Sequence, residues 1–442
     1  MADEHALPDS PSAVRSAGLV GASLIAWALG SYAYYLIAGR VVGPATYGLV
    51  SALIAVISIV AWPCVALQWS SARTLASTSL GDRDDAMAAY RLALGRSLIA
   101  GVAIGVVGIV GVGIAALISD RVPIAALTAT FLSVMPILAL YVAIGALQGE
   151  HRYGAYGISW ALTGVLRAPL MLPFLLLPAA SAGAVVVGTG LAMAVGLVAA
   201  VWASRDDLRI RVRPSPRMWA AFKKGLFAAT LGLLGYASIV GVLAVIAKLR
   251  LPTVEAGYFG AAYVIGRALL IVPQAFAIVL LPRVARRRAG DTPTGALLAG
   301  GVLATVAFGA FCVAVSAVAG EWIMRISFGS QYLEAASLLP GLFAATTAVG
   351  ALFILVNHHV ARSDSRFSWV LAALAVLDIA LLATLGSSET ALIAIDGIVA
   401  VLGIIIHEIM YRNSDDGLIG GTRAFLAGGR SRWAARRSAP TP

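Results

Sequence analysis

Long apolar runs, each about 20 residues in length, follow one another along most of the chain. The hydrocarbon core of a bilayer is about 30 Å thick, so an α-helix needs about 20 apolar residues to cross it. The pattern therefore predicts an all-α, polytopic membrane protein with about twelve transmembrane helices. The predicted spans are 17–38, 49–70, 96–118, 124–147, 155–178, 183–203, 225–247, 261–282, 296–319, 337–358, 369–386 and 391–411.

A short motif repeats about 210 residues apart, which indicates two related halves. Ala45-Thr46-Tyr47-Gly48 lies between the first two runs, and Ala256-Gly257-Tyr258-Phe259-Gly260 lies between the seventh and eighth. Each copy is followed by a proline inside the next run and a basic residue near its end (Pro63 and Arg73, Pro273 and Arg283). Repeated halves in a membrane protein are typical of transporters whose halves rock about a central site.

The repeat predicts two pseudo-symmetric six-helix lobes joined by a basic, proline-containing connection. The predicted parts are a cytoplasmic N-terminal tail (1–16), an N-lobe (17–203), a cytoplasmic inter-lobe linker (204–224), a C-lobe (225–411) and a disordered cytoplasmic tail (412–442). The first run lacks a small-residue cleavage site, so we expect it to remain as a span and not to be a signal peptide.

Composition and charge placement support a membrane protein and argue against nucleic-acid binding. Hydrophobic residues make up 60% of the chain and charged residues 12%, and the mean hydropathy is +0.91. The net charge is +11, but a cytoplasmic N-terminus would place 25 of the 32 Lys and Arg residues inside, 5 outside and 2 within spans. This asymmetry predicts cytoplasmic N- and C-termini, with the basic loops facing anionic headgroups of membrane lipids.

Several motifs together resemble a known family. They are Gly43 to Gly48, then Ala66-Leu67-Gln68 to Arg73, Gln148-Gly149 with Arg152-Tyr153, and Glu255 to Tyr258 before a helix that ends at Pro282-Arg283. In these motifs and in its whole topology the chain resembles Wzx-type polysaccharide flippases of the multidrug/oligosaccharidyl-lipid/polysaccharide exporter superfamily. The resemblance implies movement of an undecaprenyl-diphosphate-linked oligosaccharide from the inner to the outer leaflet. It implies no cofactor, and it makes glycan-assembly enzymes candidate partners.

Charged residues inside spans are the first candidates for a binding site, because an unpaired diphosphate is very costly in hydrocarbon. Arg167 lies near the middle of the fifth predicted span, and no acidic residue lies within any predicted span of the same lobe. Pro169 and Pro173 follow it and predict a kink. We expect Arg167 to contact the substrate diphosphate in a cationic inter-lobe cavity. The alternative is a structural arginine bonded to backbone carbonyls or to an aspartate of the other lobe.

The second lobe carries a basic and two acidic residues within spans: Arg267, Asp378 and Asp396. Arg267 is a further candidate for substrate contact, although a buried pair with Asp378 or Asp396 would satisfy both charges and fix packing. The two aspartates have another possible use in ion coupling, because a carboxylate in a low-dielectric pocket can take up and release a proton.

Aromatic and amide side chains near the first two spans could stack on sugar rings and hydrogen-bond to them. Tyr35, Trp62 and Gln68 are the candidates, and Arg40 at the end of the first span completes the predicted substrate-binding set. Interfacial anchoring and snorkelling are the structural alternatives near span ends. The adjacent His358 and His359 lack the i, i+4 spacing of a helical metal site, so no metal is expected there.

Two other classes of function remain open. A multidrug cation antiporter of the same fold would favour acids in the cavity, whereas the first lobe offers Arg167. A membrane enzyme would present reactive groups on a sizeable outer loop, and no GxSxG or HExxH motif occurs in a suitable context, so we do not expect an enzyme.

Overall fold

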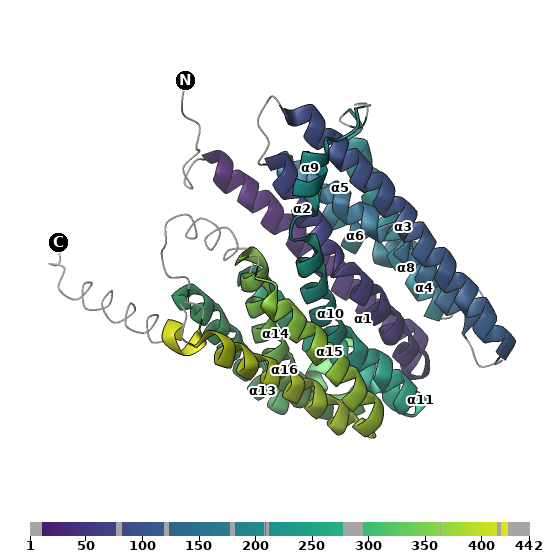
Figure 1. The fold of residues 1–442 in the computed structure, drawn as a ribbon. Coiled ribbons are helices and arrows are strands. Elements are labelled where there is room, and N and C mark those ends of the chain that lie inside the picture. Colours follow the sequence, from purple (N-terminus) through teal and green to yellow (C-terminus); the bar gives the residue numbers. More distant parts are fainter. Residues whose placement is uncertain are drawn as a thin grey trace, which may run out of the picture. The chain divides into compact units, whose positions relative to one another are not determined.

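The protein was analysed as a computed structural model, in which the only regular elements among the described residues are helices (Figure 1). The described residues are 11–76, 82–118, 123–176, 182–206, 208, 212–276, 295–362, 364–412 and 417–422. Within them, 11 stretches are long and apolar enough to cross a membrane. The predicted all-α, polytopic architecture is confirmed. The chain divides into unit 1, Met1–Thr230, and unit 2, Leu231–Pro442, and each is described by itself.

Unit 1 is a bundle of helices that pack in pairs distant in sequence. Its elements are α1 (Pro11–Ala61), α2 (Cys64–Ala76), α3 (Arg83–Ile118), α4 (Ile124–Val134), α5 (Ile137–Gly149), α6 (Tyr153–Val165), α7 (Arg167–Leu175), α8 (Ala182–Ala203) and α9 (Pro216–Lys223). The helix α1 packs along α6, α2 along α5, and α8 against α4, α6 and α7. The core of unit 1 therefore lies where α5, α6 and α8 meet the other helices.

The helix α1 contains two predicted spans. Its 51 residues would measure about 76 Å, more than twice the thickness of the hydrocarbon core. Gly43 interrupts it with φ 70° and ψ 172°, and Pro44 then begins a new helical segment. The 11 stretches thus accommodate the twelve predicted spans.

Both copies of the repeated motif, which lie between predicted spans, are helical in the structure. Residues 45–48 lie in α1 directly after the Gly43 interruption, and residues 256–260 lie in α11 (Thr253–Arg267) after Pro252. A proline fixes φ near its helical value and has no N–H to satisfy, so each copy sits in the first turns of a helix. The eighth span consequently begins about eight residues earlier than predicted, while residues 277–282 and the Pro282-Arg283 motif fall outside the described residues.

Small residues let α1 approach α6 closely. A Cβ atom on Gly164 would overlap the backbone carbonyl oxygen of Trp27, and one on Gly30 would lie 2.6 Å from the Cα of Val165. Glycines at such contacts replace side-chain packing by backbone packing, as is common between membrane helices.

We expect Gly164→Ala to lower stability by about 1–3 kcal/mol, because neither backbone can move away without disturbing its helix. The matched control is Gly111→Ala, where a Cβ would meet nothing within 4 Å. The apparent melting temperature of both variants in the same detergent checks this expectation, and equal values for the two would contradict it.

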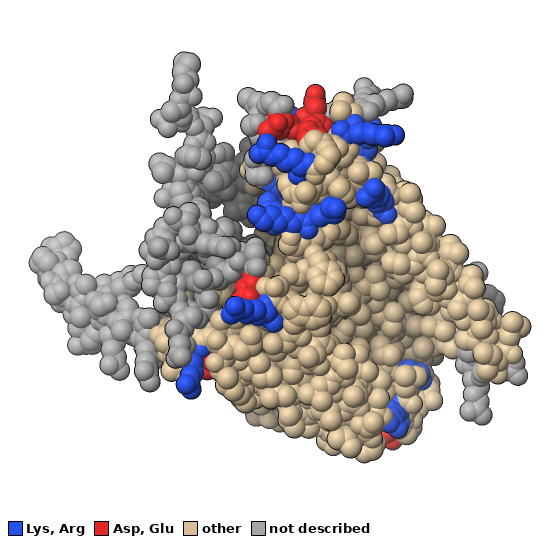
Figure 2. Space-filling view, viewed as in Figure 1, with Lys and Arg blue, Asp and Glu red and all other residues tan. Residues whose placement is uncertain are grey.

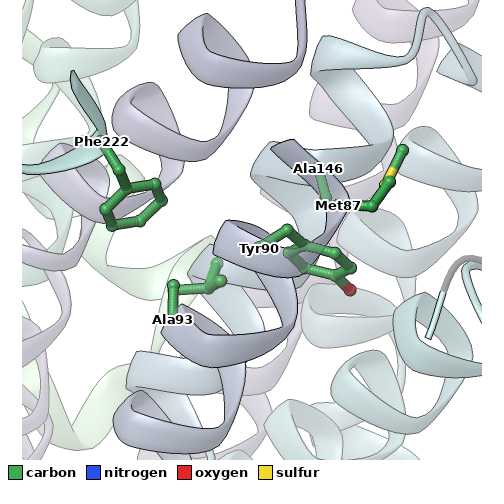
Figure 3. Close-up of a cluster of buried hydrophobic side chains, with 6 residues drawn as sticks. Met87, Tyr90, Ala93, Ala146 and Phe222 are labelled. Atoms are coloured by element: carbon green, nitrogen blue, oxygen red, sulfur yellow. The ribbon is translucent and has the colours of Figure 1, made fainter. Parts of the chain in front are cut away.

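The predicted inter-lobe linker packs onto unit 1. Phe222 of α9 is buried in a cluster with Met87, Tyr90, Ala93, Val142 and Ala146 of α3 and α5 (Figure 3). Ser70 donates to the carbonyl of Phe222, and Arg73 donates to that of Lys224 at 2.7 Å. Asp85 accepts from the backbone N–H of Ser215 at 2.6 Å, and Ser215 in turn caps α9.

Charged side chains gather around this end of unit 1. Figure 2 shows Lys and Arg with a few acids near α9 and the start of α3, beside a tan surface of uncharged residues. The hydroxyl of Tyr90 lies 2.9 Å from that of Ser204, which ties the start of the predicted linker to the same bundle. Residues 204–224, where described, are therefore part of the fold of unit 1.

Unit 2 has a comparable set of long helices. Its elements are α10 (Leu226–Arg250, which begins at the end of unit 1), α11, η3 (Ala268–Leu270), α13 (Gly295–Ser327), η4 (Ser330–Leu338), α14 (Leu339–Arg362), α15 (Arg366–Leu385) and α16 (Glu389–Tyr411). The helix α14 packs against α11, α13 and α16, and α15 packs against α16.

Among the described residues, helical structure extends into both predicted tails. The helix α1 begins at Pro11, inside the predicted tail. Residues 418–422 form a helical turn where the sequence predicts a disordered extension. Glu408 accepts from the N–H of Leu418 at 2.7 Å, which satisfies a donor at the start of that turn.

Candidate functional site

The fifth predicted span is broken where its arginine lies. The helix α6 ends at Val165 and α7 begins at Arg167. Pro169 has no N–H to donate to the carbonyl of Val165, so the helical hydrogen-bond pattern cannot continue unchanged through this turn. The kink predicted from the prolines is present, and it places the guanidinium beside irregular backbone.

Arg167 is buried, with 5% of its surface exposed. Its Nε donates to the carbonyl of Thr163 at 2.9 Å, and its Nη1 donates to the hydroxyl of Tyr35 at 3.3 Å. Among the described residues, no carboxylate forms an ion pair with it. A buried, mid-span cation thus has two neutral partners and retains capacity to bind an anion.

Two tyrosines of α1, Tyr34 and Tyr35, lie near this arginine. Tyr34 stacks at a tilt on Tyr35 (5.3 Å between centroids), and its hydroxyl donates to the carbonyl of Val185 at 2.8 Å. About two helical turns before Tyr34, Trp27 stacks on Trp160, with 5.8 Å between the ring centroids and 26° between the ring planes. Tyr34 is fully buried and anchored to α8, so it holds α1 in place, while Tyr35 reaches the guanidinium.

The other predicted substrate residues of unit 1 lie apart from Arg167. Gln68 donates through Nε2 to Oε1 of Gln148 at 2.9 Å and is buried, so it joins α2 to α5. Trp62 lies in the turn between α1 and α2, half-buried. Arg40 is exposed on α1, just before the Gly43 interruption. Of the set of Arg167, Arg40, Trp62, Gln68 and Tyr35, the structure joins Arg167 and Tyr35 by a hydrogen bond.

Unit 2 contains a second buried charge cluster. Arg267, at the end of α11, forms an ion pair with Asp396 of α16, with Nη2 and Oδ2 at 3.2 Å. The same nitrogen donates to the carbonyl of Val240 at 3.1 Å, and Cζ lies 5.0 Å above the ring of Tyr263. Only 9% of the arginine side chain and 1% of the aspartate side chain are exposed. Arg267 therefore has the structural pair that the sequence left as an alternative, and its partner is Asp396.

Asp378 of α15 has no exposed surface, and neither carboxylate oxygen has a hydrogen-bond partner among the described residues. The charges that act on it are those of Asp396 and Arg267. One arginine faces two aspartates here, so two ionised carboxylates would leave one negative charge uncompensated. A buried carboxylate without a partner is costly, so Asp378 is suited to hold a proton or a cation.

Sequence reasoning missed the residues that link helices across the bundle. Thr163 bonds Arg167 through its backbone, and Tyr263 and Val240 complete the surroundings of Arg267. The spacing of Thr163 and Arg167 at i, i+4 was the available signal, since these positions share one helix face.

Comparisons with known proteins agree with this fold. No family model matches the chain. Uncharacterised proteins of Mycobacterium bovis and of Mycobacterium tuberculosis strain H37Rv are each 28% identical over 295 residues. The match spans 62% of this chain and 63% of the length of each relative.

Solved transporters superpose on nearly the whole chain. An inward-facing multidrug resistance MATE family transporter of the MOP superfamily has a TM-score of 0.68 at 15% identity, covering 94% of this chain and 96% of that one. A MOP superfamily transporter from Pyrococcus furiosus scores 0.65 at 14% identity, with 89% and 94% covered. The lipid II flippase MurJ scores 0.62 at 12% identity, with 86% of each chain covered.

The chain has the fold of these transporters. At 12–15% identity the likeness is one of fold, and it agrees with the superfamily resemblance of the sequence motifs. The Wzx-type substrate does not follow from it.

Proposed function

We propose that the protein is a flippase that moves an undecaprenyl-diphosphate-linked oligosaccharide from the inner to the outer leaflet of a bacterial cell membrane. The observation that carries the proposal is Arg167, a buried mid-span cation with no carboxylate partner among the described residues. A diphosphate is a dianion or more and would bind such a guanidinium through charge-assisted hydrogen bonds.

The surroundings of Arg167 suit a headgroup that is anionic at one end and a sugar at the other. Tyr35 contacts the guanidinium and could donate to a sugar or phosphate oxygen. The lipid tail can stay in hydrocarbon, so only the headgroup needs polar partners. Alternating access by two related lobes, and cytoplasmic N- and C-termini, are parts of this proposal that come from the sequence repeat and the charge asymmetry.

A second candidate function is a cation antiporter, and the buried, unpartnered Asp378 is the observation that favours it. An ionised carboxylate without a partner can attract an organic or inorganic cation, and it can also take up a proton. The two candidates differ in the unit that binds the substrate: Arg167 of unit 1 for an anion, and Asp378 of unit 2 for a cation. In the flippase, Asp378 with Asp396 would instead couple an ion gradient to transport.

Reconstitution separates the two functions. The purified protein in liposomes that hold an undecaprenyl-diphosphate oligosaccharide should make the headgroup accessible across the bilayer. The same vesicles loaded with a fluorescent organic cation measure antiport. Headgroup movement without cation expulsion supports the flippase, and cation expulsion without headgroup movement would overturn it in favour of the antiporter.

We expect Asp378→Asn to remove the dependence of transport on a proton or sodium gradient, because an amide neither titrates nor neutralises a cation. Headgroup movement is measured with and without an imposed gradient. The matched control is Asp84→Asn, which changes an exposed aspartate in the first turn of α3. Gradient dependence that persists in Asp378→Asn would exclude this aspartate as the coupling site.

A further inference from the structure

Two buried histidines meet at the end of α14 and α16. His359 of α14 is 1% exposed and His407 of α16 is not exposed at all. Their Nε2 atoms lie 2.9 Å apart, and their ring centroids 5.0 Å apart. At this distance one ring donates a proton and the other accepts it, so the pair is a hydrogen bond between two imidazoles.

A carboxylate and a phenol complete the surroundings. Oδ2 of Asp364 lies 3.6 Å from Nδ1 of His359 and accepts from the Tyr411 hydroxyl at 2.6 Å. Tyr411 stacks on both imidazoles, with centroids 4.3 Å from His359 and 5.0 Å from His407. Titratable groups that contact the pair include His358 of α14, Asp364 of the following turn and Tyr411 of α16, and α15 contributes the uncharged Phe367.

Asp364 is poised to remain charged. Burial alone would raise the pKa of Asp364, but hydrogen bonds from Tyr411 and from the backbone N–H of Arg366, together with the charge of His359, hold it below its usual range. A carboxylate at this place favours one positive charge on the adjacent imidazole. One carboxylate cannot compensate the positive charges of two protonated imidazoles.

The number of protons on the pair decides whether the contact can exist. Two neutral rings share one N–H···N bond, and a single added proton turns this into a charge-assisted bond. A further proton would set two cations face to face at 2.9 Å in a buried site, where repulsion and lost hydration both oppose it. An unperturbed imidazole changes its charge between about pH 8 and about pH 5, so this is the window in which the contact is tested.

The pair also lies on the same face of α16 as the charge cluster. Leu392, Asp396, Val399, Gly403, His407 and Tyr411 form the buried stripe of this helix. His407 follows Asp396 by 11 residues, which is about three turns and about 17 Å along the axis. A shift of α16 at His407 is therefore transmitted to the Arg267–Asp396 pair through one continuous helix.

We propose that His359 and His407 form a proton-dependent latch that holds the end of α16 to α14 and opens when both imidazoles are protonated. The latch is a protonation site separate from Asp378 and Asp396. All residues of the latch belong to unit 2. Only the link between the latch and transport rests on the proposed function.

Hydrogen exchange of the full chain in lipid nanodiscs tests the latch. Amide protection of residues 403–411 is compared at about pH 8 and about pH 5.5, with labelling times scaled to the intrinsic exchange rate. We expect protection to fall about tenfold at the lower pH. In the double variant His359→Gln/His407→Gln the fall should vanish, because two amides can share a hydrogen bond but cannot take up protons.

His151→Asn is the matched control, since it removes an imidazole from unit 1 and asparagine tolerates the positive φ of 59° there. It should respond to pH as the wild type does. Wild-type protection that does not change with pH overturns the latch, and so does a double variant that keeps the tenfold fall. If the double variant does not fold, the single variant His407→Gln replaces it. His359 can then be protonated without facing a second positive ring, so this variant should also lose the pH response.

The link to transport has its own readout. Headgroup movement in liposomes is measured across the same pH window for the wild type and the double variant. A pH response of the wild type that the variant loses supports the link. If the double variant loses the pH response of hydrogen exchange but keeps the wild-type pH profile of transport, the link is wrong and the latch stands. If the wild type shows no headgroup movement at any pH, the proposed function is wrong instead.

Discussion

Arg167→Ala should reduce the rate of headgroup movement by about tenfold to hundredfold while the protein stays folded. The substitution removes a hydrogen bond between the guanidinium and the charged diphosphate, worth about 1.5–3 kcal/mol. It leaves behind a tyrosine hydroxyl and a backbone carbonyl but no buried charge, so little stability should be lost. The measurement is accessibility of the headgroup across liposomes, with the apparent melting temperature recorded for the same preparations.

Two further variants make this result specific. Arg250→Ala removes the same charge from an exposed helix end and should transport like the wild type. Arg167→Lys keeps the charge but loses the planar fork that pairs with a phosphate, so an intermediate rate is expected. A normal rate in Arg167→Ala with a lower melting temperature would show that the arginine is structural.

Asp396→Ala should lower stability by about 3–5 kcal/mol, the largest stability effect we expect in this chain. Removal of the carboxylate leaves the guanidinium of Arg267 buried, with the Val240 carbonyl and the face of Tyr263 as its remaining partners. The midpoint of denaturant unfolding in detergent measures the loss.

The control replaces the whole pair. Arg267→Met/Asp396→Leu removes both charges and fills similar volume, so its stability should return close to the wild-type value. Full transport by this double variant would show that Arg267 only fixes packing. A stable double variant without transport would place Arg267 in the binding of the substrate, and an Asp396→Ala variant as stable as the wild type would contradict the importance of the pair.

The all-helical, polytopic architecture could be predicted from the sequence because hydrophobic length alone decides it. The break at Arg167 was also predictable, since Pro169 removes a donor locally. Helix starts were harder. The motif copies at 45–48 and 256–260 lie between apolar runs, so they fall outside the predicted spans. In the structure, each copy lies in the first turns of a helical segment that begins after Gly43 or Pro252.

Contacts between helices could not be predicted, because they depend on how each helix is rotated about its axis. Both Asp378 and Asp396 were possible partners of Arg267, and among the described residues only Asp396 forms an ion pair with it. The histidines illustrate the same limit. The sequence shows His358 and His359 as neighbours without metal spacing, whereas in the structure His359 pairs with His407, 48 residues further along the chain.

The packing of α9 on unit 1 decides where the gene could be divided. Charge and proline content suggest a cut near residue 204, but a fragment that ended there would lose the aromatic side chain of Phe222 from its interior and the partners of Asp85 and Arg73. The first residue beyond this packing is Gly225, which has φ 76° and open space around its Cα. A split protein, an inserted fluorescent domain or an affinity tag belongs at that glycine, and every such design would carry residues 212–224 with the first half.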